Sequence, residues 1–181
     1  MNRTYFESYC GRGPYAENYL FHSGIEHCIE IVNHFGIRVD SVLVLGAATG
    51  QVLEHFERAW GVLPEGCEIS RWAHARIPAR HRRRIARSDM RHYVPARLRG
   101  GAQVDLIFSN SLVYLPAREV AGFLAQCGRL GRHFHFLSST SEDYEPGDRE
   151  RRTLRPRAWW RERFLGAGFR PTRSPYLWRR P

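Results

Sequence analysis

The chain has 181 residues, of which 43% are hydrophobic and 25% charged, with a formal net charge of +10; this is the composition of a globular protein with a single core. Its four cysteines (Cys10, Cys28, Cys67 and Cys127) are widely spaced and form no C-x-x-C pair, which argues against a disulfide framework or a metal site. No apolar run could span a membrane and the N-terminus has no signal-peptide pattern, so we expect a cytoplasmic protein without a membrane partner.

Residues 1–39 are expected to form an N-terminal segment in front of a core at 40–181. Aromatic residues crowd the first part of this segment, together with glycine and proline. We expect its tyrosines, Tyr15 and Tyr19 among them, to form a lid over a site, because glycine and proline indicate mobile backbone. The alternative is an aromatic cluster that packs on the edge of a sheet.

Ser23 and Glu26 form a capping box in front of apolar residues at helical spacing, and Gly36 ends that helix. From residue 40 onward, strand patterns alternate with helical ones, and Pro116 and Pro156 are expected at the first positions of two helices. The expected strands are SVLVL (41–45), GCEIS (66–70), RIARSD (84–89), VDLIFSN (104–110) and HFHFLSS (133–139). FRPTR and PYLWRR predict a terminal hairpin.

This alternation predicts an α/β fold: a doubly wound, mostly parallel, seven-stranded sheet with helices on both faces and a C-terminal antiparallel hairpin. In such sheets, ligands bind at the carboxyl ends of the strands near the switch point after the first strand. The stretch VLVLGAATG (42–50) lies there. Its spacing, G-x-A-x-G, differs from the G-x-G-x-x-G of dinucleotide-binding proteins, which argues against a pyrophosphate and against a nicotinamide dehydrogenase.

Acidic residues follow the next two expected strands. Glu68 ends the second strand, where a carboxylate can accept hydrogen bonds from a ribose diol. Asp89 ends the third and can accept from an adenine amino group, or it can simply pair with Arg87 and Arg91. As a strand-end acid, Glu68 is expected to contribute little to stability. The turn and the two acids predict a ligand that contains adenosine without phosphates.

At these residues the chain resembles the class I S-adenosylmethionine-dependent methyltransferases, in particular small bacterial ones. The glycine motif is matched by Gly46, Ala48 and Gly50, the motif after the fourth strand by VDLIFSNSLVYLP, and the closing helix by WWRERFLGAGF. The resemblance covers roughly residues 40–180. It implies an enzyme with S-adenosyl-L-methionine as cofactor and no metal. The cofactor-binding residues that it implies are Gly46, Ala47, Ala48, Gly50, Glu68, Ile69, Asp89, Met90, Asn110 and Ser111.

The chain departs from the family pattern in three places. Val44 replaces a common acid that helps to hold the methionine amino group, and Ala48 replaces the central glycine. Tyr114 stands where histidine is frequent. Tyr114 is the residue that we name as catalytic base or positioning residue; the alternative is packing at the strand end. Because of these departures, a second possibility for the chain stays open: an inactive partner subunit that binds the cofactor.

The methyl acceptor is expected to be an oxygen or nitrogen of a small molecule, with RNA or protein as alternatives. All 28 basic residues are arginine, which indicates a coding bias. We therefore favour a solvated basic surface over a nucleic-acid interface, although runs such as HRRRIAR attract anions. The Asp-Pro-Pro-Tyr type motif of amino-methylating nucleic-acid enzymes is absent. The pattern does not indicate an oligomeric state.

Overall fold

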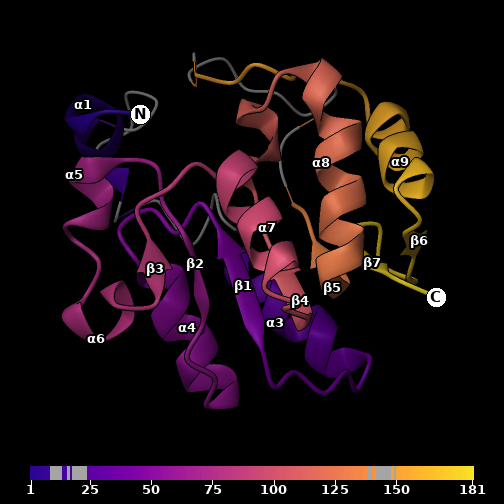
Figure 1. The fold of residues 1–181 in the computed structure, drawn as a ribbon, viewed down its shortest axis with the longest axis horizontal. Coiled ribbons are helices and arrows are strands. Elements are labelled where there is room, and N and C mark those ends of the chain that lie inside the picture. The colour runs from indigo at the N-terminus through magenta and orange to yellow at the C-terminus, as the bar shows by residue number, and fades with distance from the viewer. Residues whose placement is uncertain (9–13, 16, 18–23, 138–139, 142–147, 149) are drawn as a thin grey trace.

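The computed structural model describes residues 1–8, 14–15, 17, 24–137, 140–141, 148 and 150–181 (Figure 1). The strands are β1 (Val42–Leu45), β2 (Glu65–Cys67), β3 (Ile85–Ala86), β4 (Val104–Phe108), β5 (Gly131–His135), β6 (Arg170–Pro171) and β7 (Leu177–Arg179). The helices are α1 (Arg3–Glu7), α3 (Ile25–His34), α4 (Gln51–Trp60), α5 (Arg71–His74), α6 (Ala79–Arg82), α7 (Met90–Arg99), α8 (Ala117–Leu130) and α9 (Arg157–Gly166), with a 3-10 turn, η2 (Ser111–Tyr114).

The strands form one seven-stranded sheet in the order β3-β2-β1-β4-β5-β7-β6. The pairs from β3 to β5 are parallel, and β7 runs antiparallel to both β5 and β6. The predicted fold class, with its C-terminal hairpin, is therefore confirmed. The chain winds outward from β1 to β3 and then returns to β4. The switch point, where ligands bind in such sheets, lies between β1 and β4.

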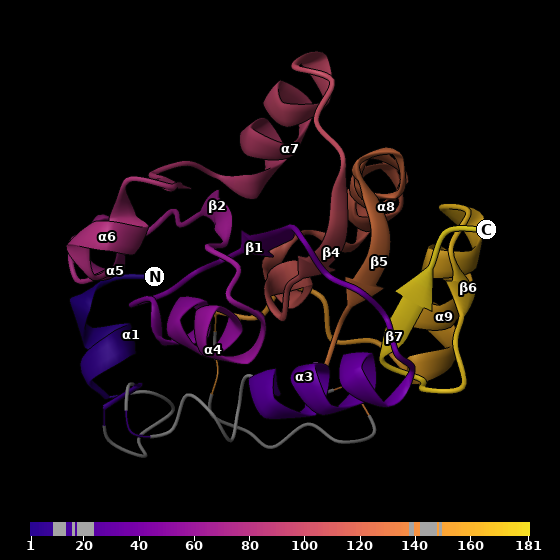
Figure 2. The same cartoon turned by 90° about the horizontal axis from the view of Figure 1, so that it is seen from below.

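Both faces of the sheet are covered, which is why the central strand is apolar throughout. Leu43 and Leu45 of β1 pack on one side, and Val42 and Val44 pack on the other, because successive side chains of a strand point to opposite faces. Figure 2 shows α7 and α8 over one face and α3 and α4 over the other. Phe6 of α1 also belongs to the second cluster.

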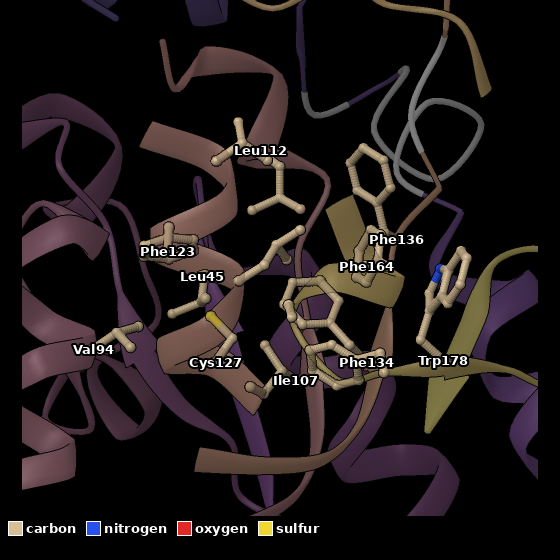
Figure 3. Packing of buried hydrophobic residues seen from close by; sticks show 14 of the residues in the cluster. Leu45, Val94, Ile107, Leu112, Phe123, Cys127, Phe134, Phe136, Phe164 and Trp178 are labelled. Atoms are coloured by element: carbon tan, nitrogen blue, oxygen red, sulfur yellow. The ribbon is translucent and has the colours of Figure 1, made fainter. Parts of the chain in front are cut away.

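The first cluster continues from α8 to the C-terminal hairpin (Figure 3). Phe164 of α9 stacks on Trp178 of β7, with ring centroids 4.6 Å apart, and meets Phe134 of β5 edge to face at 5.4 Å. These aromatic contacts hold α9 and the hairpin against the end of the parallel sheet, away from the switch point.

Several local predictions need correction. The N-cap of α3 is Gly24, in a left-handed conformation, and not the predicted Ser23, which lies outside the described residues. Pro116 and Pro156 are N-caps with extended backbone, so α8 and α9 begin one residue after them. The helix α7 was not predicted. Met90, Tyr93, Val94 and Leu98 recur at helical spacing and pack on the first cluster, but Pro95, which disfavours a helix interior, lies among them.

Candidate functional site

The turn after β1 adopts backbone conformations that match its small residues. Gly46 and Gly50 have φ of +87° and +95°. Ala48, at +49°, is the non-glycine residue with positive φ among the described residues. A Cβ atom on Gly46 would lie 2.2 Å from the Oγ of Ser111, so the turn and the segment after β4 approach closely only because Gly46 has no side chain. The amides of Gly46 and Ala47 donate to the carbonyl of Cys67, which joins the turn to β2.

Glu68 lies directly after β2 and binds this turn. Its Oε2 accepts a hydrogen bond from the Ala48 amide at 2.8 Å, and its Oε1 accepts from the Ser70 amide at 2.7 Å. The residue is only 4% exposed. Burial raises the pKa of Glu68 above its ordinary value, and the two backbone hydrogen bonds act in the opposite direction. Each oxygen keeps a second lone pair for a ligand.

This geometry corrects the expectation that Glu68 contributes little to stability. Removing its carboxylate would leave the buried amides of Ala48 and Ser70 without their acceptor. The neighbouring Ile69 is 56% exposed, which is unusual for a large apolar side chain and leaves an apolar surface beside the carboxylate. Ser70 then caps α5 by accepting from the amide of Ala73.

Asp89 follows β3 and is the N-cap of α7. Its Oδ1 accepts from the backbone amide of Arg91 at 2.8 Å, and its Oδ2 accepts from Arg91 Nη2 at 2.6 Å. Burial would raise the pKa of Asp89, but the hydrogen bonds and charge of Arg91 outweigh burial and hold it below the ordinary value. The suggested pairing with Arg91 is therefore present. Met90 packs against the core cluster under α7 and α8.

The segment after β4 is tied to both neighbouring strands. The hydroxyl of Ser109 donates to the carbonyl of Leu45 at 2.9 Å and accepts from the amide of Ser111. The side-chain carbonyl of Asn110 accepts from the amide of Leu137, after β5, at 3.0 Å. Ser111 thus lies against Gly46 of the glycine turn, whereas the side chain of Asn110 is bound to the segment after β5. Val44, where an acid is common, is fully buried among apolar side chains.

A second polar group lies beyond this segment, around Tyr114. The Tyr114 hydroxyl donates to Asp148 Oδ2 at 2.6 Å and lies 2.7 Å from the Tyr5 hydroxyl. Arg151 Nε donates to the same Asp148 oxygen at 3.3 Å, and the Asp148 side chain is 2% exposed. Tyr114 is therefore part of a half-buried hydrogen-bonded cluster around the buried Asp148 carboxylate, and it does more than pack at a strand end. Asp148 and Arg151 were not predicted as site residues, whereas Tyr5 is one of the N-terminal tyrosines that were expected to form a lid.

The N-terminal helix α1 connects this cluster to the region beside Glu68. Phe6 stacks on Trp72 of α5, with ring centroids 5.5 Å apart, while Tyr5 reaches Tyr114. Tyr15 lies against both Tyr5 and Phe6, with centroids 6.3 and 5.3 Å away. Tyr19 lies outside the described residues. Of the two tyrosines named for a lid, Tyr15 thus belongs to an aromatic group that lies between two parts of the candidate site.

No group of three or more His, Cys, Asp or Glu residues that could hold a metal ion occurs in the described part of the chain. Cys28, Cys67 and Cys127 are buried free thiols, whereas Cys10 falls outside the described ranges. Among the residues that the structure describes, no helix is long and apolar enough to cross a membrane.

Comparison with known proteins gives structural neighbours only. No protein-family model and no curated protein sequence matches the chain. DesVI from Streptomyces venezuelae has a TM-score of 0.67 and 17% identity over 92% of this chain and 97% of that one. The magnesium protoporphyrin IX methyltransferase ChlM from Synechocystis PCC 6803, with bound SAH (S-adenosylhomocysteine), has a TM-score of 0.62 and 16% identity. The match covers 87% of this chain and 80% of ChlM. The cyclopropane synthase MmaA2 from Mycobacterium tuberculosis has a TM-score of 0.63 and 12% identity over 81% of this chain. The chain spans only 61% of the length of MmaA2.

At identities this low the likeness concerns the fold, and it agrees with the strand order, the glycine turn and the acid after β2. The chain therefore has the fold of the class I S-adenosylmethionine-dependent methyltransferases, the family that its motifs resemble.

Proposed function

We propose that the protein binds S-adenosyl-L-methionine and transfers its methyl group to an oxygen or nitrogen of a small molecule. The observation that carries this proposal is the carboxylate of Glu68, buried at the carboxyl end of β2 and hydrogen-bonded to the glycine turn. A ribose diol would donate to the remaining lone pairs of its two oxygens. Structures of ChlM with SAH and with SAM support this choice of cofactor.

The rest of the cofactor fits the same edge of the sheet. Exposed Ile69 offers an apolar surface for one face of the adenine. Asp89, at the N-terminus of α7, offers an acceptor for the adenine amino group, although Arg91 already occupies part of its capacity. The methionine end would lie along Gly46 and Ala47, with Asn110 and Ser111 opposite. Ala48 donates its amide to Glu68, so its strained conformation serves the ribose site.

We assign Tyr114 as the residue that takes the proton of the methyl acceptor, and Asp148 as the hydrogen-bond partner of the Tyr114 hydroxyl. In methyl transfer, a lone pair of the acceptor attacks the methyl carbon while the carbon–sulfur bond breaks and its electron pair returns to sulfur. The acceptor proton passes to the Tyr114 oxygen as the tyrosine proton moves to Asp148 Oδ2, 2.6 Å away. A half-buried cluster of hydroxyls around a carboxylate can take a proton from an oxygen or nitrogen acceptor, and the name of ChlM gives a small-molecule acceptor for one protein with this fold.

The test has two steps. Calorimetric titration with S-adenosylmethionine, and separately with S-adenosylhomocysteine, should give saturable binding of both. Incubation with methyl-labelled cofactor and a small-molecule extract should then label a low-molecular-weight product. Failure to bind either compound would refute the proposal. Binding without label transfer to any fraction would favour the inactive partner subunit, and label in the RNA or protein fraction would favour a macromolecular acceptor.

A further inference from the structure

The positive charge of the protein is concentrated in one segment. Residues 71–99 contain ten arginines and one acid, Asp89, whereas the other 152 residues contain 18 arginines and 17 acids. Coding bias explains why the basic residues are arginine and not lysine. It does not explain why acids are missing from one segment. This segment carries +9 of the net charge of +10, and residues 100–181, with 14 arginines and eight acids, are less basic per residue.

The segment begins at one edge of the sheet and ends over one of its faces. Figure 1 shows α5 and α6 beside β3, at the outer side of the sheet, and Figure 2 shows α7 over the face that α8 also covers. The Ile85 carbonyl in β3 accepts a hydrogen bond from His74 Nε2 at 2.7 Å, which joins α5 to the strand. Arg82 Nη1 donates to the Ala75 carbonyl at 3.1 Å and joins α6 to α5. The charged side chains therefore project from a well-connected base.

Most of these arginines have no acidic partner. Ion pairs join Arg80 to Glu57, Arg91 to Asp89 and Glu119, and Arg97 to Glu65. In the described ranges, no carboxylate lies within salt-bridge distance of the other seven: Arg71, Arg76, Arg82, Arg83, Arg84, Arg87 and Arg99. All of the seven except Arg82 are exposed. Concentrated like charge destabilises a compact fold, so a surface of this kind is best explained by a polyanionic ligand.

The chemistry of the surface selects among polyanions. Whatever the origin of the arginines, their guanidinium groups bind phosphates in a bidentate manner and stack on bases, so the surface is able to bind nucleic acids. A membrane-binding surface would need apolar side chains beside the charges. The large apolar side chains that are exposed in the described part of the chain are Met1, Leu63, Ile69 and Leu154; none lies within 71–99, and among them Ile69 alone adjoins the segment, so the charges have no apolar surface beside them beyond one side chain. The helices α5 and α6 have four residues each, too short to read a duplex groove.

We propose that α5, α6, β3 and α7 form an arginine face that binds the phosphate backbone of single-stranded RNA. The face begins at Arg71, three residues after Glu68, so bound RNA lies beside the opening of the candidate cofactor site. This inference does not depend on the methyl acceptor being RNA. It requires only that the exposed guanidinium groups contact phosphates and release counterions when RNA binds.

The test is fluorescence anisotropy with a labelled single-stranded RNA of about 20 nucleotides at several salt concentrations between about 0.05 and 0.3 M. The full chain is compared with the triple variant Arg83→Gln/Arg84→Gln/Arg87→Gln. Each lost phosphate contact should reduce the slope of log affinity against log salt by about 0.7. Loss of three contacts should therefore flatten the slope by about 2 and weaken binding at least about tenfold near 0.15 M salt.

The matched control is Arg161→Gln/Arg170→Gln/Arg173→Gln, which removes the same charge from exposed positions on α9 and the terminal hairpin. It should change RNA affinity less than about threefold, since only long-range charge is lost. An equal loss in both variants would overturn the proposal, as would the absence of RNA binding by the full chain at low salt. Equal or tighter binding of anionic phospholipid vesicles or of polyglutamate would also overturn it.

Titration with S-adenosylhomocysteine separates this inference from the proposed function. Both triple variants should bind it like the unmodified chain, because none of the six arginines is assigned to the cofactor site. If the unmodified chain fails to bind it while RNA binding depends on the arginine face, the proposed function fails and the arginine face stands.

Discussion

At the scale of single residues, Glu68 connects the stability of the site to its proposed chemistry. Its two oxygens accept from amides in two different loops, which fixes the distance between the glycine turn and α5. A carboxylate held in this way needs little reorganisation when a ribose arrives. Because of the same two hydrogen bonds, a substitution at Glu68 changes the free energy of unfolding as well as the affinity for the cofactor.

Glu68→Ala should weaken binding of S-adenosylhomocysteine by about 10- to 1000-fold, since hydrogen bonds to a charged group contribute roughly 1.5–3 kcal/mol each and ~1.4 kcal/mol is one decade. It should also lower the free energy of unfolding by about 1–3 kcal/mol, because buried amides lose their acceptor. Calorimetry and urea denaturation measure the two effects. Glu68→Gln, which keeps the shape and one carbonyl oxygen, should lose less of both. Unchanged affinity in Glu68→Ala would show that the ribose lies elsewhere.

Residues of this kind differ in how far the sequence could predict them. Glu68 was predicted because a strand pattern and a glycine turn fix its neighbourhood within a short stretch of chain. Asp148 was not, because it lies 34 positions from Tyr114, beyond α8 and β5, in a stretch of sequence without periodicity. A loop acid carries no pattern, so only the three-dimensional structure brings it to the tyrosine.

At the scale of secondary-structure elements, α1 holds two parts of the candidate site together through one ring stack and one hydroxyl. Phe6 packs on Trp72 of α5, and the Tyr5 hydroxyl lies in the Tyr114–Asp148 cluster. If α1 acts as a lid, the hydroxyl contact holds it closed over the cofactor. The ring contacts of Tyr5 with Phe6 and Tyr15 do not need that hydroxyl.

Tyr5→Phe should therefore speed the release of S-adenosylhomocysteine several-fold while it changes the free energy of unfolding by only about 0.5–1.5 kcal/mol, the net contribution of one hydrogen bond. Stopped-flow displacement measures the release rate. Tyr93→Phe, which removes a hydroxyl on α7, is the matched control and should release the ligand at the original rate. A release rate in Tyr5→Phe equal to that of the control would argue that α1 is a fixed part of the core and not a lid.

The packing of α3 on β5 should make stability depend on pH. His135 is fully buried and stacks on Phe108 at 5.4 Å, and neither of its ring nitrogens has a hydrogen-bond partner among the residues that the structure describes. Burial lowers the pKa of His135 to about 3, and nearby His27 adds to the effect. In the unfolded chain the ordinary value is about 6.5. The folded state thus disfavours protonation, so this stabilisation is complete above about pH 6.5 and is lost as the pH falls toward 3.

A difference of one bound proton between the unfolded and folded states changes the free energy of unfolding by about 1.4 kcal/mol per pH unit. His135 alone should therefore lower the free energy of unfolding by roughly 2 kcal/mol between pH 6.5 and 5. His135→Phe should remove that part of the acid sensitivity, as measured by urea denaturation at several pH values. His34→Gln, at the exposed end of α3, serves as the control and should keep the original dependence. The same slope in His135→Phe and the unmodified chain would show that His135 is protonated in the folded state.

Among the elements, the buried strands were predicted because apolar runs on both faces leave a clear pattern, as in β1 and β4. The bounds were less accurate: β3 has only two residues where six were expected, because strand pairing at a sheet edge is set by the neighbouring strand β2. The helix α7 was not predicted for a different reason. Four of its ten residues are arginine or histidine and Pro95 lies inside it, so its helical state depends on packing against α8 and on the Asp89 cap.

At the scale of the whole molecule, the order of elements determined the architecture and the place of the site before any side-chain contact was known. Alternating strands and helices predict parallel pairing, and parallel pairing brings the ends of β1, β2 and β4 to one edge. The arginine face could not be predicted from the net charge and composition of the whole chain. Net charge and arginine count alone suggested a solvated surface, whereas the distribution of acids along the chain, mapped on the fold, separates one edge from the rest.

The division of the chain at residue 39 remains a prediction, and α3 determines how it should be tested. Ile25, Cys28 and Val32 of α3 have no exposed surface and pack in the same cluster as Val42 and Val44 of β1. A chain that begins at residue 40 would expose that face of the sheet. At roughly 1.5–3 kcal/mol for each buried apolar side chain, the loss equals much of the stability of a domain.

We therefore expect residues 24–181 to melt in one cooperative transition, at a lower temperature than the full chain because Phe6 and its contact with Trp72 are gone. Residues 40–181 should show no cooperative transition and should bind a dye for exposed apolar surface. Calorimetry and near-ultraviolet circular dichroism distinguish the two. A cooperative transition in residues 40–181 close to that of 24–181 would mean that α3 belongs to the N-terminal segment as a dispensable cover, and that the sheet with α4, α7, α8 and α9 is a complete core.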